Sequence, residues 1–216
     1  KAVLEHPQSH TYRDYGTAAM TQLTQRFAGI PVRNFSRGTF DEVEKIGGEA
    51  LREYTLTRGK PSDPSHACMA GCTIKCSNVF GGEDGKIIVS PLEYETIGLM
   101  GSNLGIDDIE AVAQANLLCD DWGIDTISTG ACIGWAMECF NKGVFTPKET
   151  DGLDLSWGNV EAVKELGRLV AHARTTATYL VATGAGRDVY ATRGRVTHEG
   201  IFNTRSGAFR CPSTQQ

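Results

Sequence analysis

Residues 66–78 read His-Ala-Cys-Met-Ala-Gly-Cys-Thr-Ile-Lys-Cys-Ser-Asn, so Cys68, Cys72 and Cys76 follow one another with three residues between neighbours. This spacing can bring three sulfurs to one centre, which is how a chain wraps an iron–sulfur cluster. A [4Fe–4S] cluster usually has four thiolate ligands, so the fourth ligand must come from elsewhere. The stretch therefore predicts a cysteine-rich loop built around a metal centre.

Other interpretations of this triplet stay open from the residues alone. Free cysteines often pack as small buried hydrophobic side chains. Zinc is a further alternative, with His66 as its fourth ligand. The glycine within the run and the prolines before it, Pro61 and Pro64, favour a ligand loop over packing.

The other cysteines are the candidates in this chain for the fourth ligand: Cys119, Cys132, Cys139 and Cys211. Apolar neighbours on predicted helices favour packing for the first three. Seven cysteines, three of them within nine residues, also argue against a disulfide framework.

Composition and charge exclude several classes of protein. The chain has 216 residues, 40% of them hydrophobic, and a net charge of −5. This length allows one or two domains, and the charge does not favour nucleic acid or an anionic membrane as partner. No apolar run approaches the roughly 20 residues of a membrane span, and residues 1–6 do not resemble a signal peptide, so we expect a cytoplasmic protein.

Apolar periodicity predicts a mainly α fold, an irregular helical domain with a cysteine-rich loop and at most short strands. Thr39 and Glu42 form a capping-box pattern for a helix that reaches Tyr54, with Gly47 and Gly48 weakening its middle. The other predicted elements are a short strand at 86–90 and helices at 106–119, at about 130–142 before Gly143, and after Ser156 to residue 170.

A second candidate site is the stretch 119–130, Cys-Asp-Asp-Trp-Gly-Ile-Asp-Thr-Ile-Ser-Thr-Gly. Asp120 and Asp125 flank a glycine turn between two predicted helices. Carboxylates there can accept hydrogen bonds from a ring rich in N–H groups, and glycine lets the backbone approach a flat ligand closely. A capped helix–turn–helix corner explains the same pattern.

Several segments in a fixed order resemble the aldehyde ferredoxin oxidoreductases, which are tungsten- or molybdenum-dependent bis-pterin enzymes. The segments are the cysteine triplet, Glu93-Tyr-Glu-Thr96, Gly101-Ser-Asn-Leu-Gly105 and the stretch 120–130, preceded by Gly16-Thr17 and Pro31-Val-Arg-Asn-Phe35. The resemblance covers residues 12–170. Many members have two residues between the first two cysteines, where this chain has three.

The resemblance implies a role for each motif. It assigns Cys68, Cys72 and Cys76 to a [4Fe–4S] cluster. The pterin-binding motif falls on Asp120, Gly123, Ile124 and Asp125. Glu95 corresponds to the acidic residue near the tungsten or molybdenum, with Glu93 as the second choice, and a carboxylate there can move a proton during the reaction.

The resemblance also implies the activity of the complete enzyme, oxidation of a small aldehyde to a carboxylic acid. Electrons would leave through the cluster to ferredoxin or an electron-transfer subunit, and the full-length enzyme could form a homo-oligomer. The implied domains are a tail of a preceding domain at 1–11 and a helical cofactor-binding domain at 12–172. The chain then corresponds to a fragment that we expect to be inactive alone.

Two further hypotheses accompany this interpretation. The rival function is a non-catalytic iron–sulfur electron-transfer or metal-binding module that carries no pterin. Residues 173–216 form the third predicted segment, irregular and compatible with an out-of-frame translation, because they lack the residues with which the family continues. Under that hypothesis Cys211 is not a cluster ligand.

Overall fold

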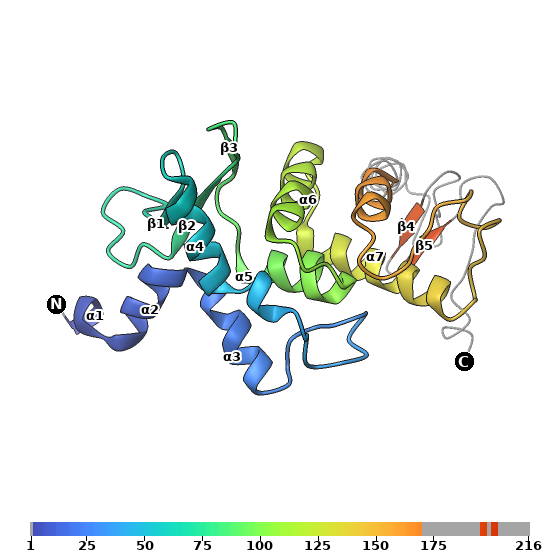
Figure 1. Ribbon diagram of the computed structural model, residues 1–216, viewed down its shortest axis with the longest axis horizontal. Helices are drawn as coiled ribbons and strands as arrows, with labels where there is room; N and C mark the ends of the chain where they lie inside the picture. The colour runs from blue at the N-terminus through green and yellow to red at the C-terminus, as the bar shows by residue number, and fades with distance from the viewer. Residues whose placement is uncertain (1, 170–194, 198–199, 203–216) are drawn as a thin grey trace, which may run out of the picture. The chain divides into compact units, whose positions relative to one another are not determined.

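The computed structural model describes residues 2–169, 195–197 and 200–202 (Figure 1). The chain divides into two compact units, Lys1–Leu117 and Leu118–Gln216. Both are mainly helical in their described parts, and a small three-stranded antiparallel sheet accompanies the helices. The predicted fold class is confirmed.

The first unit consists of short helices around the three-stranded sheet. Its helices are α1 (Ala2–Glu5), α2 (Pro7–Tyr15), η1 (Thr17–Ala19), α3 (Met20–Arg26), η2 (Val43–Lys45), α4 (Gly48–Arg58), α5 (Tyr94–Thr96), the π-helical turn η3 (Ile97–Gly101), η4 (Ser102–Leu104) and the start of α6 (Ile109–Trp122). Its strands are β1 (Asp63–His66), β2 (Ser77–Gly81) and β3 (Ile87–Val89), with β2 in the middle. The cysteine run therefore connects two antiparallel strands, β1 and β2.

The second unit contains the end of α6, α7 (Thr126–Asn141) and a helix over residues 160–169. Asp125 caps α7, and Asn159 Oδ1 accepts the Ala162 N–H at the start of the later helix. Buried side chains of this unit include Ile133, Met137 and Leu166. The helices predicted at 106–119, 130–142 and 156–170 are thus present, although α7 begins four residues earlier than predicted.

The predicted tail, residues 173–216, lies outside the described residues except for a short hairpin. There the backbones of β4 (Arg195–Thr197) and β5 (Gly200–Phe202) pair antiparallel. Cys211 lies outside the described residues, so the hypothesis about its role stays a prediction.

The helix predicted to begin at Thr39 begins instead at Gly48, so the predicted capping box is wrong. Gly47 has an extended backbone and forms the N-cap, and only a single 3₁₀ turn, η2, precedes it. A Cβ on Gly48 would lie 3.0 Å from backbone atoms of Ala18. The two glycines therefore break the expected helix and let α4 approach η1 closely.

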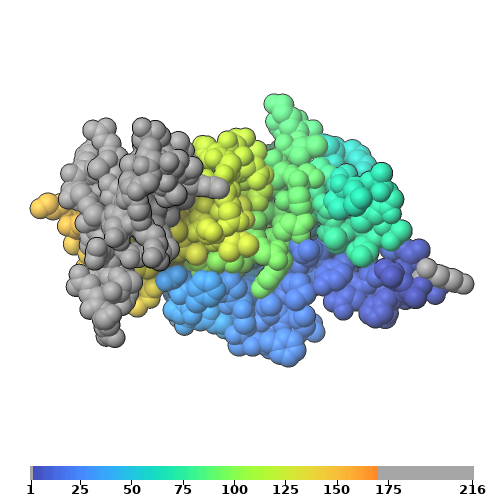
Figure 2. Space-filling view, turned by 180° about the vertical axis from the view of Figure 1, so that it is seen from behind, coloured from blue at the N-terminus to red at the C-terminus, as the bar shows by residue number. Residues whose placement is uncertain are grey.

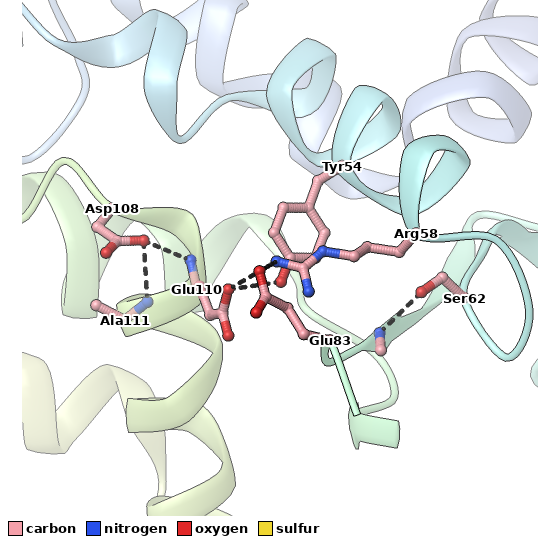
Figure 3. Close-up of polar contacts among 8 residues, drawn as sticks. Tyr54, Arg58, Ser62, Glu83, Asp108, Glu110 and Ala111 are labelled. Atoms are coloured by element: carbon pink, nitrogen blue, oxygen red, sulfur yellow. Dashed lines mark hydrogen bonds and ion pairs between the residues drawn. The ribbon is translucent and has the colours of Figure 1, made fainter. Parts of the chain in front are cut away.

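Arg58 links α4 to α6 and to the turn between β2 and β3 (Figure 3). Its Nη2 lies 3.1 Å from Glu83 Oε1 and 3.2 Å from Glu110 Oε2, and Tyr54 Oη donates to the same Glu110 oxygen at 2.7 Å. The Tyr54 ring stacks on Phe80 of β2 at 4.3 Å. At the start of α6, Asp108 Oδ1 accepts the N–H groups of Glu110 and Ala111 and so caps the helix.

Asn78 joins β2 to the segment that follows β3. Its side chain is fully buried; Nδ2 donates to Leu92 C=O at 2.8 Å and Oδ1 accepts Leu92 N–H at 3.0 Å. Ser90 Oγ donates to the Asn78 backbone carbonyl at 3.0 Å. Leu92 is also fully buried, so no water replaces these bonds when they are lost.

Asn78→Ala should lower the free energy of unfolding by about 2–4 kcal/mol, because it leaves two buried backbone groups of Leu92 unpaired. Ser90→Ala is the matched control and should cost less, about 0.5–1.5 kcal/mol, since it removes one bond at an exposed residue. Urea unfolding of the chain measures both. Equal unfolding midpoints for the two variants would contradict this account of the hydrogen bonds between Asn78 and Leu92.

Candidate cofactor site

The cysteine loop places three thiols at one end of the sheet, between β1 and β2. Cys68 is exposed, and Cys72 and Cys76 are partly exposed. The backbone N–H groups of Lys75 and Ile74 hydrogen-bond to the Cys72 sulfur. A thiol made accessible and held in this way is suited to act as a thiolate ligand.

The surroundings of Cys72 favour its charged form. Hydrogen bonds from the N–H groups of Lys75 and Ile74 lower the pKa of the Cys72 thiol, and the Cys68 thiol and the Lys75 ammonium act in the same direction. Lys75 has a φ of +56°, which turns the chain back so that its N–H faces the sulfur. The local backbone therefore stabilises the thiolate form of Cys72 relative to the thiol.

Cys76 is more buried than Cys72 and lies near three other ionisable groups, Cys68, Cys72 and Glu93. Burial raises the pKa of the Cys76 thiol, and the Glu93 carboxylate, Cys72 and Cys68 raise it further. The three sulfurs and Glu93 thus lie close enough to interact electrostatically. Several thiolates at one place repel each other until a cation binds between them, and bound iron would supply that charge.

The gathered thiols fit an iron–sulfur cluster by their chemistry. In the described parts of the chain, no three His, Cys, Asp or Glu side chains converge closely enough to hold a single metal ion. A cluster of several iron atoms holds its thiolates farther apart than a single ion does. Three neighbouring thiols, one stabilised as the thiolate, match such a donor set.

Glu93 lies on the inner side of the loop. Thr17 Oγ1 donates a short hydrogen bond to Glu93 Oε2 and accepts the Tyr94 N–H at 2.9 Å. Burial raises the pKa of the Glu93 carboxyl, and the nearby Glu95 carboxylate also raises it, whereas the bond from Thr17 lowers it. Glu95 is exposed on α5.

Gly16 brings this network against the last cysteine. A Cβ on Gly16 would lie 2.7 Å from the backbone oxygen of Cys76, and its φ is +62°. Gly16 also precedes Thr17, so the glycine and the Thr17–Glu93 bond belong to one junction. Neither the spacing of the cysteines nor local propensity reveals this contact; only the resemblance included Gly16-Thr17 among its motifs.

In the second unit, the stretch 119–130 forms a closely capped corner between α6 and α7. The Ile124 N–H donates to Cys119 C=O at 2.9 Å, and the Gly123 N–H donates to Asp120 C=O at 3.1 Å, the two bonds of a Schellman motif. Gly123 has a φ of +63°, as this motif requires. Asp125 Oδ2 then accepts the Ser128 N–H at 2.6 Å and caps α7.

Asp120 and Asp125 both lie near the buried Cys119. Burial raises the pKa of the Cys119 thiol to about 12, and both carboxylates contribute in the same direction. Burial and Asp121 raise the pKa of Asp120. Two carboxylates that flank a glycine turn can accept hydrogen bonds from the N–H donors of a pterin ring, although Asp125 also has its structural role as a cap.

The other cysteines of the second unit behave as packing residues. Cys119 and Cys139 are buried, and burial raises the pKa of the Cys132 thiol to about 11. A raised pKa opposes formation of the thiolate that iron requires. Cys119 and Cys139 are thus buried as predicted, whereas Cys132 is partly exposed, and no fourth cluster ligand is evident among the described residues.

The described chain thus combines a mainly helical fold, a sheet loop with three cysteines and, in the second unit, a glycine corner between two acids. Residues 1–200 match the family described as "Aldehyde ferredoxin oxidoreductase, domains 2 & 3". The chain belongs to this family.

Individual relatives agree with this assignment. The chain is 36% identical over 151 residues to a tungsten-containing aldehyde ferredoxin oxidoreductase of Thermococcus kodakarensis, an alignment that covers 69% of the chain and 24% of the relative. The enzyme of the same name from Pyrococcus furiosus is 35% identical over the same shares of the two chains. An aliphatic sulfonate oxidoreductase, WOR-like subunit, of Pyrococcus furiosus is 30% identical over 165 residues, 74% of the chain and 25% of the relative.

The chain thus spans about a quarter of the length of these relatives. No helix in the described ranges has both the length and the apolar character of a membrane span.

Gly16→Ala should reduce the iron bound per chain severalfold after reconstitution with iron and sulfide, because the new methyl group displaces the Cys76 backbone. Gly59→Ala is the matched control: Gly59 has a φ of +66°, and a Cβ there would meet nothing within 4 Å. Both glycines have nearly the same backbone conformation, with φ of +62° and +66° and ψ of −159° and −162°, which is essentially restricted to glycine, so both variants carry a similar strain of roughly 1–3 kcal/mol. Iron analysis and urea unfolding separate the two effects, and equal iron contents would refute the proposed junction.

Proposed function

We propose that Cys68, Cys72 and Cys76 hold a [4Fe–4S] cluster in an enzyme that oxidises a small aldehyde to a carboxylic acid. The observation that carries the proposal is the loop itself, with three neighbouring thiols and two backbone N–H groups on the Cys72 sulfur. Membership of the family supports the same assignment. The chain would contribute one cofactor-binding region to the complete enzyme.

The other centre of the proposal is a tungsten or molybdenum bis-pterin, for which Asp120, Gly123, Ile124 and Asp125 are the proposed contacts. This cofactor would supply the two-electron chemistry at the carbonyl carbon. The corner would hold the ring through carboxylate oxygens, and Gly123 lacks a side chain that would obstruct a flat group. Electrons would leave by way of the cluster to ferredoxin or an electron-transfer subunit.

Glu95 and Glu93 have different proposed roles. Glu95 is exposed, so its carboxylate can move to take or give a proton. Glu93 is held by Thr17 next to Cys76 and suits a positioning role near the cluster. These environments support Glu95 as the proton-handling group.

The rival function, an iron–sulfur module without pterin, makes a different prediction for metal content. Iron alone in a protein that contains this segment favours the module, whereas iron together with tungsten or molybdenum favours the enzyme. Metal analysis of the purified protein distinguishes them.

Cys72→Ser should abolish most bound iron and the broad absorbance near roughly 400 nm that thiolate-bound iron–sulfur clusters show. Cys132→Ser is the control, because burial raises the pKa of that thiol and it lies outside the loop. Iron analysis and visible spectra of the reconstituted chain provide the readout. Full colour in the Cys72 variant would exclude the proposed ligand set.

Glu95→Gln in a complete enzyme should retain the metals and the pterin but lower the rate by roughly 10²–10⁴, the usual contribution of a positioned acid–base group. Glu93→Gln preserves an acceptor for Thr17 and should have the smaller effect on the rate. Steady-state kinetics with metal analysis measure both. A large loss from Glu93→Gln with normal turnover of Glu95→Gln would transfer the role to Glu93.

A further inference from the structure

One hydroxyl group, that of Thr17, joins the N-terminal segment to the acidic segment at the start of α5. Thr17 Oγ1 donates a hydrogen bond to Glu93 Oε2 and accepts the Tyr94 N–H at 2.9 Å. The hydroxyl has a single proton, and giving it to Glu93 favours the charged carboxylate over the neutral acid. The bond from Thr17 accordingly lowers the pKa of the Glu93 carboxyl, whereas burial raises it.

No cation accompanies the Glu93 carboxylate. The groups that shift the pKa of its carboxyl are its burial, the Thr17 hydroxyl and the Glu95 carboxylate. The sequence around Glu93 is also one-sided in charge, because residues 87–141 contain nine Asp and Glu and no Lys, Arg or His. A partly buried carboxylate that is held by a neutral hydroxyl alone keeps its negative charge and is screened less than an exposed one.

This carboxylate lies beside the last cysteine of the loop. Of the charged groups around Cys76, Glu93 raises the pKa of the thiol most, ahead of the other two thiols of the loop. Gly16 packs on the same cysteine, since a Cβ there would lie 2.7 Å from the Cys76 carbonyl oxygen. In Figure 2 the dark-blue N-terminal segment adjoins the teal segment that contains the loop. The dipeptide Gly16–Thr17 therefore connects the backbone of Cys76 to the side chain of Glu93.

Cys72 has the opposite electrostatic surroundings. Its sulfur accepts the N–H groups of Lys75 and Ile74, and the Lys75 ammonium also favours its charged form. The potential of an iron–sulfur centre depends on the hydrogen bonds to its sulfurs and on the net charge nearby. Donors at Cys72 make the addition of an electron easier, whereas a carboxylate near Cys76 makes it harder.

We propose that Thr17 is a positioning residue that fixes the Glu93 carboxylate beside Cys76, and that this fixed charge lowers the reduction potential of a cluster held by the loop. The inference rests on the proposed function, because it requires iron on Cys68, Cys72 and Cys76. One added electron increases the negative charge at the loop, and repulsion from Glu93 opposes that increase. No bond or proton changes place, and Thr17 acts only through Glu93.

The experiment measures the reduction potential of the full chain after reconstitution with iron and sulfide. Dithionite is added stepwise under argon with mediator dyes, and visible absorbance reports the reduced fraction. Glu93→Gln removes the charge at nearly constant size and keeps an oxygen acceptor for Thr17. It should raise the equilibrium constant for one-electron reduction by about 5- to 10-fold, which is roughly 40–60 mV at 59 mV per tenfold.

Variants of Thr17 test the positioning role. Thr17→Val removes the hydroxyl and frees the carboxylate to turn toward water, so it should raise the same constant by about 2- to 5-fold. Thr17→Ser retains the hydroxyl and should stay within about 1.5-fold of the unsubstituted chain. The double variant of Thr17→Val with Glu93→Gln should match Glu93→Gln alone, because Thr17 has no carboxylate left to position.

Glu44→Gln is the matched control for net charge. Glu44 is exposed in η2 and is not among the groups that mainly shift the pKa of Cys72 or Cys76. This variant should leave the constant within about 1.5-fold, because water and salt screen an exposed charge. A shift equal to that of Glu93→Gln would show that net charge decides the potential, and would overturn the inference.

Iron analysis separates this inference from the proposed function. A chain that binds no iron refutes the proposed function and this inference with it. With iron bound in full, an unchanged potential in Glu93→Gln overturns the inference alone.

Two results would remove Thr17 from the account. One is a normal potential in Thr17→Val when Glu93→Gln shifts it. The other is a double variant in which the two shifts add, because Thr17 would then act independently of Glu93. If Thr17→Val lowers the iron content, Thr17→Ala takes its place as the variant without a hydroxyl.

Discussion

The two hydrogen bonds between the Asn78 side chain and the Leu92 backbone connect the end of the cysteine loop to the acidic segment of the first unit. Asn78 lies two residues after Cys76, and Leu92 directly precedes Glu93. One buried side chain thus fixes the last cysteine and the acidic segment relative to each other. Because both partners are fully buried, water cannot substitute for these bonds, and the arrangement is rigid where the candidate cofactor site requires it.

Local signals in the sequence predicted the fold where local interactions decide it. Helices α6 and α7 have apolar periodicity and acidic N-caps, and both occur. The prediction from Thr39 failed because Gly48 packs directly on the backbone of Ala18, a contact between segments far apart in the sequence. Strand β2 was missed since all five of its residues are buried, which removes the alternation that normally identifies a strand.

In the candidate site, too, local sequence signals predicted one part, and contacts between distant segments determine the other. The cysteine loop could be predicted from three residues at regular spacing, because all three lie within nine residues of chain. The proximity of Glu93 to Cys76 depends on the hydrogen bonds between Asn78 and Leu92. It also depends on Thr17, which is seventy-six residues away from Glu93 in sequence. Such a contact has no local pattern, and the resemblance assigned Glu93 only as the second choice for the acid near the tungsten or molybdenum.

The corner at Asp120–Asp125 shows why a motif and its structural explanation do not exclude each other. Gly123 is required by its positive φ, and Asp125 is required as the cap of α7, so either residue would be expected without a ligand. The Schellman motif uses the backbone carbonyl of Asp120, which any residue could supply. The two capping motifs therefore do not require an acid at position 120, which is exposed near the end of α6. A structural role for Gly123 and Asp125 is thus compatible with the pterin contact proposed above.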